Sequence, residues 1–446
     1  MQASGWALEA LRQRDDPSRM HAQCANPSDR TAPIPAGMYS TVERAGPEQG
    51  RGAMPIRPAA GGSVDPVLLI VLILIIVVIV ALSRRSSRRI RRWRNPDGDV
   101  ALLQQQGLPV LRNEEELAVA LGVTMPQLIW LADRRRKCRV NGYSSHYHIQ
   151  CKPKPDGSMR VLMAPRPKLK AAQRWILQHI LGKIPLPEVA HGFRSGHSIL
   201  THAAPHADAE AVVCCDLRDF FHTISYPRVR GIFQSLGYGD RVAVVLALLC
   251  TSWLPGTRRR VLPQGAPSSP ALSNLAARRL DRRLAGLAAS LGYRYSRYAD
   301  DCAFSGSPRP LGALIRTVRR IVRSEGFSLH EGKLRIHRRG ARQVVTGVVV
   351  NQTPAVPRAE RRRLRALLHQ AQYTGLEAQN RTEHTHFTSY LQGKIAFIRM
   401  INPAHAHPLH AALRRVLPGA GVPVDVTTIT EREAYEPGPD ELTFND

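Results

Sequence analysis

The sequence contains few cysteines, and they follow no pattern. Seven Cys residues occur among 446, and no two of them have the spacing of a CxxC pair. A zinc ribbon or a disulfide scaffold requires regularly spaced cysteines. We therefore expect neither, and we expect the chain to work in a reducing compartment.

Acidic residues are scarce relative to basic ones. The chain has 35 Asp and Glu against 63 Lys and Arg, which gives a formal net charge of +28. Such an excess favours a polyanionic partner, either nucleic acid or an acidic lipid surface. With 43% apolar and only 22% charged residues, the chain is not a histone-like tail, and its length suits two or three domains.

The first 65 residues lack lysine and any sustained apolar periodicity. Their seven Arg are balanced by seven acidic residues, so the excess charge lies further along the chain. Because this stretch is rich in Pro, Gly, Ser and Ala, we predict that residues 1–65 are disordered. We predict the same for residues 418–446, which end in an acidic stretch.

Residues 66–82 form a 17-residue run without a polar side chain. As a helix it spans roughly 26 Å, close to the thickness of a bilayer core. A buried strand or core helix seldom runs so long without a polar residue, and no small-residue cleavage site follows as in a signal peptide. We predict a single membrane-spanning helix at 66–83.

Seven Arg lie between positions 84 and 94, directly after this run. By the positive-inside rule they place the following residues in the cytoplasm. We therefore predict a basic juxtamembrane linker at 84–110 and a bacterial cytoplasmic location for the rest. Two short helices should follow, capped by Asn113 and Thr124. The pair could read DNA as a helix-turn-helix or simply pack together.

Three aspartates follow predicted strands. Asp216 ends the apolar run Ala211–Cys215, and Asp300-Asp301 lie between two strand-like stretches. A helix cap and a solvated turn are the ordinary explanations. However, adjacent carboxylates are costly unless a cation neutralises them, and three from two strands can hold two Mg²⁺. In so basic a chain, this set predicts phosphoryl transfer on a nucleic-acid strand.

Four ordered motifs resemble those of the reverse transcriptases. Asp216–Phe221 resembles motif A, Leu262–Pro270 motif B, and Tyr298-Ala-Asp-Asp301 the YADD box of motif C. Gly326-Phe327 followed by Glu331-Gly-Lys333 resembles motif D. The resemblance implies an α+β right-hand polymerase, with fingers and palm at 111–351 and a thumb at 352–417, preceded here by the membrane helix.

Two further segments resemble the bacterial retron reverse transcriptases. His191-Gly-Phe193 matches their HGF segment, and Val345-Thr346-Gly347 matches their VTG signature. Their NAxxH element is altered to His202-Ala-Ala-Pro-His206, with His in place of Asn. The resemblance covers roughly residues 110–415. His191 and His197 suggest a metal pair by type, but no ligand set surrounds them, so we predict structural roles.

The resemblance assigns roles to individual residues. The implied catalytic residues are Asp216, Asp300, Asp301 and Lys333, the last protonating the departing pyrophosphate. The implied metal ligands are the three aspartates and the backbone carbonyl of Leu217. The implied nucleotide-binding residues are Lys154, Arg160, Phe221, Gln264 and Gly265, with Phe221 excluding a 2′-hydroxyl. Plain core for Phe221, a solvated surface position for Lys333 and an ordinary loop at Gln264-Gly265 remain alternatives.

RNA-binding residues are implied around the thumb. They are Val345, Thr346, Gly347, Arg361, Arg362 and Arg365. The first three belong to a predicted apolar strand at 344–351, and the arginines to a predicted basic helix at 358–371. A merely solvated helix is the alternative.

The predicted function is retron-type RNA-directed DNA synthesis. The family resemblance implies extension of a guanosine 2′-hydroxyl in a cognate structured RNA with dNTPs, giving an RNA–DNA hybrid and RNA-linked single-stranded DNA. It also implies antiphage defence with a separate effector protein. The alternatives are a diversity-generating, intron-encoded or CRISPR-linked reverse transcriptase, or an inactive membrane-anchored nucleic-acid-binding protein.

Overall fold

The computed structural model describes most of the chain after residue 97. The described ranges are 98–133, 139–140, 143–144, 146–154, 157, 159–381 and 383–417. The predicted disordered segments and the predicted membrane helix at 66–83 lie outside them. Within them, no helix combines the length and the apolar character needed to cross a bilayer. The described residues divide into two compact units, 98–186 with 219–278 and 187–218 with 279–417.

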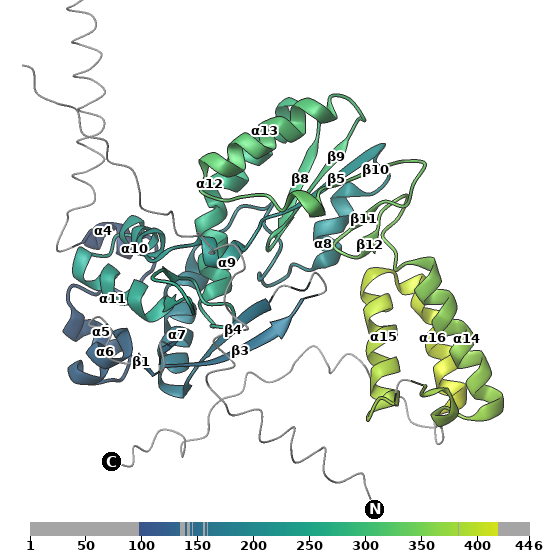
Figure 1. Ribbon diagram of the computed structural model, residues 1–446, viewed down its shortest axis with the longest axis horizontal. Helices are drawn as coiled ribbons and strands as arrows, with labels where there is room; N and C mark the ends of the chain where they lie inside the picture. The colour runs from purple at the N-terminus through teal and green to yellow at the C-terminus, as the bar shows by residue number, and fades with distance from the viewer. Residues whose placement is uncertain are drawn as a thin grey trace, which may run out of the picture. The chain divides into compact units, whose positions relative to one another are not determined.

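The first unit is mainly helical (Figure 1). Its helical elements are α4 (Val100–Gln105), α5 (Glu114–Ala120), α6 (Met125–Ala132), α7 (Pro167–His179), η2 (Leu181–Lys183), α9 (Phe220–Thr223), α10 (Tyr226–Ser235), α11 (Asp240–Cys250) and the first part of α12 (Ser269–Ser290). Three antiparallel ribbons pair β1 (Arg139–Val140) with β2 (Tyr143–Ser144), β3 (Tyr147–Pro153) with β4 (Met159–Pro165), and β6 (Ser252–Trp253) with β7 (Arg260–Val261).

The two predicted helix caps are confirmed. The Asn113 side chain accepts a hydrogen bond from the Glu116 backbone N–H at 2.8 Å. Thr124 and Gln127 form a reciprocal capping box at the start of α6. These side chains satisfy N–H groups that a helix start otherwise leaves without partners.

The predicted linker at 84–110 is corrected in its last part. Residues 100–105 form α4, whose N-cap Asp99 accepts from the Leu102 N–H at 3.0 Å. Leu103 and Leu108 are buried. Their apolar contacts fix this segment in the fold, which a prediction based on the neighbouring charge overlooked.

A buried glutamine ties the first unit together. Gln173 of α7 donates from Nε2 to the Tyr147 hydroxyl at 2.9 Å and to the Leu249 carbonyl at 2.8 Å. A second residue, Arg260 of β7, also joins separate elements of the first unit. It donates to the carbonyls of Leu248 and Thr251 at the C-terminal end of α11. A cation there complements the helix dipole and occupies carbonyls that the helix itself leaves unpaired. These bonds position β3, β4 and the loop that follows β7.

The second unit is built on a four-stranded antiparallel sheet. Its strands are β5 (Ala211–Asp216), β8 (Arg294–Tyr298), β9 (Asp301–Gly306) and β10 (Arg335–Arg338), in the order β10-β5-β9-β8. The remaining elements are α8 (Ile199–Ala203), η3 (Ala204–His206), the second part of α12, α13 (Leu311–Ser324), η4 (Glu331–Lys333), β11 (Val344–Val345), β12 (Val348–Val349), α14 (Arg358–Thr374), η5 (Glu377–Gln379), α15 (Phe387–Ile401) and α16 (Pro403–Val416).

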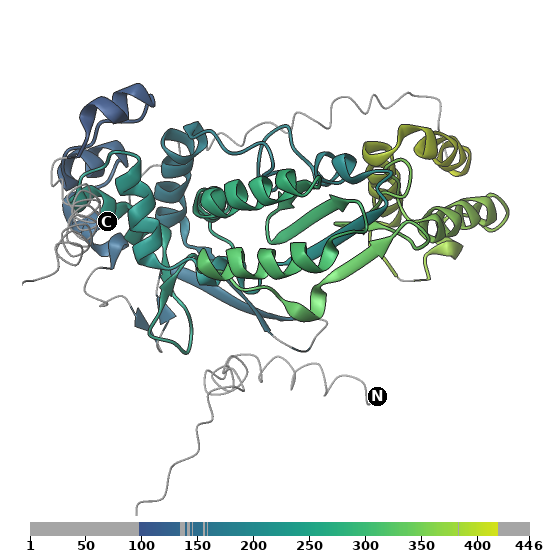
Figure 2. The same ribbon diagram turned by 90° about the horizontal axis from the view of Figure 1, so that it is seen from above.

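The two faces of this sheet have different partners. α12 and α13 lie side by side over one face (Figures 1 and 2), joined by ion pairs from Arg279 and Arg283 to Glu325. α8 and η3 contact β8 from the other face. On β8, the Tyr295 side chain binds Asp281 of α12, and the next side chain, that of Ser296, binds His202 of α8. Alternation along a strand sends successive side chains to opposite faces.

Two buried histidines bind the serines on the α8 side. His202 Nδ1 and His206 Nε2 each lie 2.7 Å from Ser296 Oγ, and His206 Nδ1 lies 2.7 Å from Ser305 Oγ. Burial, followed by nearby positive groups, lowers the pKa of each histidine to about 3. Both rings are therefore neutral at physiological pH.

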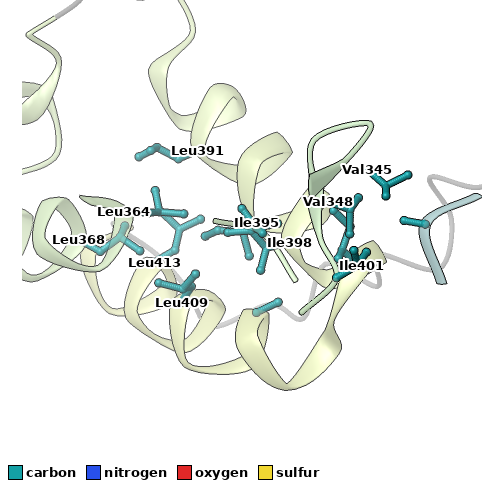
Figure 3. Close-up of a cluster of buried hydrophobic side chains, with 14 of the residues drawn as sticks. Val345, Val348, Leu364, Leu368, Leu391, Ile395, Ile398, Ile401, Leu409 and Leu413 are labelled. Atoms are coloured by element: carbon teal, nitrogen blue, oxygen red, sulfur yellow. The ribbon is translucent and has the colours of Figure 1, made fainter. Parts of the chain in front are cut away.

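The residues predicted as the thumb form three helices around one apolar core. Figure 3 shows side chains of α14, α15 and α16 meeting between the helices. Val345 and Val348 belong to the same cluster, and so do Val212 of β5 and Ala303 of β9. The core is thus continuous from the sheet to the helices.

The predicted strand at 344–351 is wrong as a single strand. β11 and β12 instead form a two-residue hairpin, with Val345 paired to Val348. Both turn residues have positive φ, 45° at Thr346 and 83° at Gly347. This is the pattern of a turn that matches the twist of paired strands. The consecutive valines on both sides of the turn concealed it.

Candidate active site

The three aspartates among the predicted metal ligands meet at one end of the sheet in the second unit. Asp216 is the last residue of β5 and pairs directly with Asp301, the first residue of β9. Tyr298 also pairs with Asp301, so Ala299 and Asp300 form the two-residue turn of the β8–β9 hairpin. The predicted strand–turn–strand at the YADD sequence is therefore confirmed, and the register places Asp216 opposite it.

The turn that carries Asp300 has an unusual backbone. Ala299 has φ of 57°, a conformation that hairpin turns usually assign to glycine, asparagine or aspartate. The Leu217 N–H donates to the Asp300 carbonyl at 2.9 Å, and the His330 N–H donates to the Asp216 carbonyl at 2.8 Å. Main-chain bonds thus fix the turn and the end of β5 to each other.

Lys333 lies beside the aspartates. Its Nζ donates to Asp216 Oδ2 at 2.9 Å, and its side chain is 53% exposed while that of Asp216 is 10% exposed. Burial opposes the lysine's charge, but the hydrogen bond to Asp216 and the charges of the three aspartates raise the pKa of Lys333. The lysine is therefore fully protonated at neutral pH, as a proton donor must be.

The environment of Asp301 raises the pKa of its carboxyl group. Burial, and then the like charges of Asp300 and Asp216, raise its pKa from 3.8 to about 6, with Lys333 opposing the shift. A divalent cation between these carboxylates would remove the repulsion.

The donor set fits a divalent cation chemically, because hard cations prefer carboxylate and carbonyl oxygens. Within the described ranges, no three His, Cys, Asp or Glu side chains already enclose one point as a finished metal site does. Asp216 is bound by Lys333 instead. A cation at Asp216 Oδ2 would therefore take the place of the lysine. Leu217, directly after Asp216, stays a prediction as a carbonyl ligand.

We expect Asp301→Asn to stabilise the metal-free protein at pH 7.5. A carboxyl whose folded pKa is raised contributes stability that is fully present below its unfolded pKa and is lost as the pH rises through about 6. The loss of folding stability is at most about 3 kcal/mol at neutral pH. Asparagine does not titrate, so the variant does not lose this stability. Thermal unfolding in chelator should show a higher melting temperature for the variant at pH 7.5 and a smaller gap at pH 4.5. Equal melting temperatures at pH 7.5 would contradict the prediction.

The predicted nucleotide-binding residues all lie in the first unit. Gln264 is held against β4, since its carbonyl accepts from the Met163 N–H at 2.7 Å. Gly265 has φ of 118°, and a Cβ there would lie 3.1 Å from the Met163 carbonyl oxygen. A side chain at this position would collide with the strand, so the glycine allows the loop to run along β4.

Phe221 and Lys154 are near a common residue. Phe220 is buried and Phe221 is half-buried. The pKa of the next residue, His222, is lowered by burial and then by the charges of Lys154 and Arg259, with Asp219 opposing. Lys154 therefore lies within electrostatic range of the segment that carries Phe221.

Arg160 lies on β4 directly opposite Lys152 of β3, and both side chains are exposed. Like charges facing each other across two strands are destabilising by themselves. An anionic ligand such as a phosphate would offset the repulsion between Lys152 and Arg160.

The predicted RNA-binding residues divide into buried and exposed ones. Val345 is 1% exposed and belongs to the core, so its side chain anchors the hairpin. Thr346 is at the strained turn, and its buried hydroxyl has no hydrogen-bond partner in the part of the chain that the structure describes. Arg361 donates from Nε to the Val356 carbonyl, whereas Arg362 and Arg365 are exposed on α14.

The two histidines predicted to be structural have protein partners. His191 Nδ1 lies 3.0 Å from Thr201 Oγ1, and His197 Nδ1 lies 3.1 Å from the Ser195 carbonyl.

Sequence reasoning missed a buried ion pair behind the aspartates. Arg297 of β8 and Asp281 of α12 are both 0% exposed and bind each other. Strand alternation places Arg297 on the inward face of β8, which could have marked it as buried. Nothing in the sequence marked Asp281, 16 residues earlier, as its partner.

The chain is similar to known reverse transcriptases. Residues 152–377 match the family profile described as reverse transcriptase (RNA-dependent DNA polymerase). The chain is 44% identical over 324 residues to the retron Mx65 reverse transcriptase of Myxococcus xanthus, covering 70% of this chain and 73% of that one. It is 38% identical over 338 residues to the retron Mx162 reverse transcriptase of the same organism, covering 69% and 67%. It is 35% identical over 272 residues to the retron Ec86 reverse transcriptase of Escherichia coli, covering 60% and 80%.

Proposed function

Because this chain belongs to the retron reverse transcriptases, which are RNA-directed DNA polymerases, we propose that it copies a cognate structured RNA into single-stranded DNA that stays joined to that RNA. The growing chain starts on a guanosine 2′-hydroxyl of the RNA. The direct pairing of Asp216 with Asp301, with Asp300 in the adjoining turn, is the observation that carries the catalytic part of this proposal.

The reaction proceeds by two-metal nucleotidyl transfer with Mg²⁺. When bound, the two Mg²⁺ ions would supply a lower pKa for the attacking hydroxyl and positive charge that offsets the charge of the departing pyrophosphate. Asp216, Asp300 and Asp301 supply the carboxylates that hold them. Lys333, protonated and 2.9 Å from Asp216, donates its proton to the leaving group once it has released that carboxylate.

The first unit binds the incoming nucleotide. Lys154 and Arg160 contact the triphosphate, and Gln264 and Gly265 line the pocket floor along β4. Phe221 excludes the 2′-hydroxyl and so selects dNTPs. Thr346, Gly347 and the exposed arginines of α14 contact the RNA and the RNA–DNA hybrid. The excess of positive charge on the chain supports this arrangement, since phosphate contacts dominate nucleic-acid affinity.

Nucleic acid that co-purifies with the full-length protein tests the proposal. We expect sequencing to recover one structured RNA from the protein's own host together with DNA complementary to part of it. The DNA should keep a ribonucleotide remnant after RNase treatment and change its mobility accordingly. RNA without DNA, and no incorporation of dNTPs on that RNA, would favour an inactive nucleic-acid-binding protein. DNA with no covalent link to RNA would favour one of the other bacterial reverse transcriptases.

The polymerase is also proposed to be tethered to the cytoplasmic face of the membrane by residues 66–83, and to act with a separate effector protein in antiphage defence. The uninterrupted apolar run and the seven arginines after it support the tether. The family resemblance supports the defence role.

We expect the full-length protein to pellet with membranes and a variant lacking residues 1–83 to stay in the soluble fraction. The matched control is a variant lacking residues 1–65, which keeps the apolar run and should still pellet. Carbonate washing separates insertion from attraction of the arginines to acidic lipid. Full-length protein in the soluble fraction would refute the tether.

A further inference from the structure

A buried arginine, Arg297, contacts the turn that joins β8 to β9 and contains Asp300. Arg297 donates from Nε to Asp281 Oδ1 and from Nη2 to Asp281 Oδ2, each at 2.7 Å. Its third nitrogen, Nη1, donates to the Ala299 carbonyl at 2.8 Å. Both charged side chains are 0% exposed. The planar guanidinium therefore binds a carboxylate on one side and the turn's backbone on the other.

The Ala299 carbonyl belongs to the peptide group that joins Ala299 to Asp300. A hydrogen bond to this oxygen fixes the plane of that peptide, and with it the direction in which the chain enters Asp300. Ala299 has a positive φ of 57°, so the turn needs contacts that hold it in this conformation. The bond from Arg297 is one such contact.

The main chain of Arg297 is held as firmly as its side chain. Its N–H donates to the Val189 carbonyl at 2.7 Å, and its carbonyl accepts from the His191 N–H at 2.8 Å. The Tyr295 hydroxyl donates to Asp281 Oδ1 at 3.0 Å, which fixes the carboxylate. The guanidinium therefore has little freedom relative to β8 and α12.

Stability alone gives a weak reason for such a pair. Taking two charges out of water costs about as much as their attraction returns, and apolar replacements of the whole pair are often neutral. What an apolar pair cannot supply is the donor to the Ala299 carbonyl.

We propose that Arg297, held in place by Asp281, is a positioning residue that sets the direction of the Asp300 and Asp301 carboxylates toward the divalent cation. The proposal rests on the assignment of these aspartates as metal ligands. Arg297 acts through the backbone of the turn and does not touch the metal or the substrate.

The test compares two double replacements in the full-length protein. Arg297→Met with Asp281→Leu removes both charges, so neither is left buried without its partner. The control, Arg283→Met with Glu325→Leu, removes the ion pairs that Arg283 and Arg279 of α12 make with Glu325 at the C-terminal end of α13, and it leaves the bond from Arg297 to the turn in place. Mn²⁺ alone serves as the probe, and its binding is measured by calorimetry and by the metal-induced rise in melting temperature.

We expect the Arg297/Asp281 variant to melt within about 5 °C of the unmodified protein in chelator. Its half-saturating Mn²⁺ concentration should rise about 10- to 100-fold, the usual cost of removing a group that orients metal ligands. Its kcat should fall by a similar factor with little change in KM for dNTP. The control should keep the Mn²⁺ affinity and kcat of the unmodified protein.

A folded Arg297/Asp281 variant with unchanged Mn²⁺ affinity and kcat would overturn the proposal. If that variant does not fold, Arg297→Lys decides, because a lysine keeps the charge opposite Asp281 but has one nitrogen in place of the three that bind both Asp281 oxygens and the Ala299 carbonyl. Unchanged Mn²⁺ affinity in Arg297→Lys would overturn the proposal, and a loss of affinity in the folded protein would support it.

Failure of the metal assignment itself gives a different result. In that case Asp301→Asn would leave Mn²⁺ binding unchanged in a chain with intact Arg297. Binding that depends on Asp301 but not on Arg297 would refute the positioning role alone.

Discussion

We expect DNA synthesis to fall by more than about a thousandfold when Asp300 and Asp301 are replaced together by alanine. Loss of a single group that stabilises transition-state charge costs about 10²–10³ in kcat, and this change removes two carboxylates from the proposed metal site. It also removes the carboxylate of Asp301, whose pKa is raised by burial and then by like charges, so that its charged form destabilises the metal-free protein at neutral pH. The fold should therefore survive, and the metal-free protein should melt no earlier than the unmodified one. Primer extension on an RNA template at saturating dNTP measures the rate.

The control for this change is Asp208→Asn. Asp208 is an exposed aspartate of the same unit that pairs with Arg339 on the surface. An exposed pair of this kind contributes about 0–1 kcal/mol, and we expect its loss to leave the rate unchanged. Metal-dependent synthesis that survives in the Asp300/Asp301 variant would show that the catalytic carboxylates lie elsewhere.

Gly192→Ala should lower kcat by about a hundredfold, although residue 192 carries no chemistry. A Cβ at this position would lie 2.4 Å from the Ala299 backbone nitrogen and 3.2 Å from the Tyr298 carbonyl carbon. These are main-chain atoms, so the methyl group can be accommodated only if the catalytic turn moves. A displacement of about 1 Å at reacting groups can cost about 10²-fold. Single-turnover kinetics on a preformed RNA-primed complex would separate this effect from weaker RNA binding.

Gly286→Ala is the matched control for the glycine change. Gly286 lies in α12 in the same unit, and nothing is within 4 Å of a Cβ built there. Alanine is about 0.8–1 kcal/mol better than glycine inside a helix, so this variant should melt higher and keep its kcat. Gly192→Ala with unchanged kcat would mean that residues 191–192 can move away from the turn.

The parts of the fold that follow from local chemistry were predictable. The side chains of Asn113 and Thr124 cap helices because they satisfy neighbouring N–H groups, a rule that acts within four residues. The strand before Asp216 and the hairpin around Asp300 followed from apolar runs and alternation. The family resemblance then linked Asp216 to Asp301, which the register confirms as direct partners.

The features that sequence reasoning missed depend on distant partners. In the sequence Arg297 looks like any other basic residue. Only the packing of α12 on β8 shows that Asp281 is its ion-pair partner. The hairpin at Thr346-Gly347 was concealed because consecutive valines on both sides of the turn read as one continuous apolar run. α4 was missed because a helix of six residues is too short to show a periodic pattern, and because its one buried residue, Leu103, packs near Gly237, far away in sequence.

The histidine at position 202 changes the shape of its site but not the charge. A neutral imidazole offers one donor and one acceptor nitrogen, and the asparagine found there in the retron pattern also offers an amide donor and a carbonyl acceptor. With its pKa lowered to about 3, His202 stays uncharged throughout the pH range of a living cell. Beside Ser296 it therefore acts as a larger, aromatic equivalent of an amide, and the substitution adds no proton-sensitive group beneath the sheet.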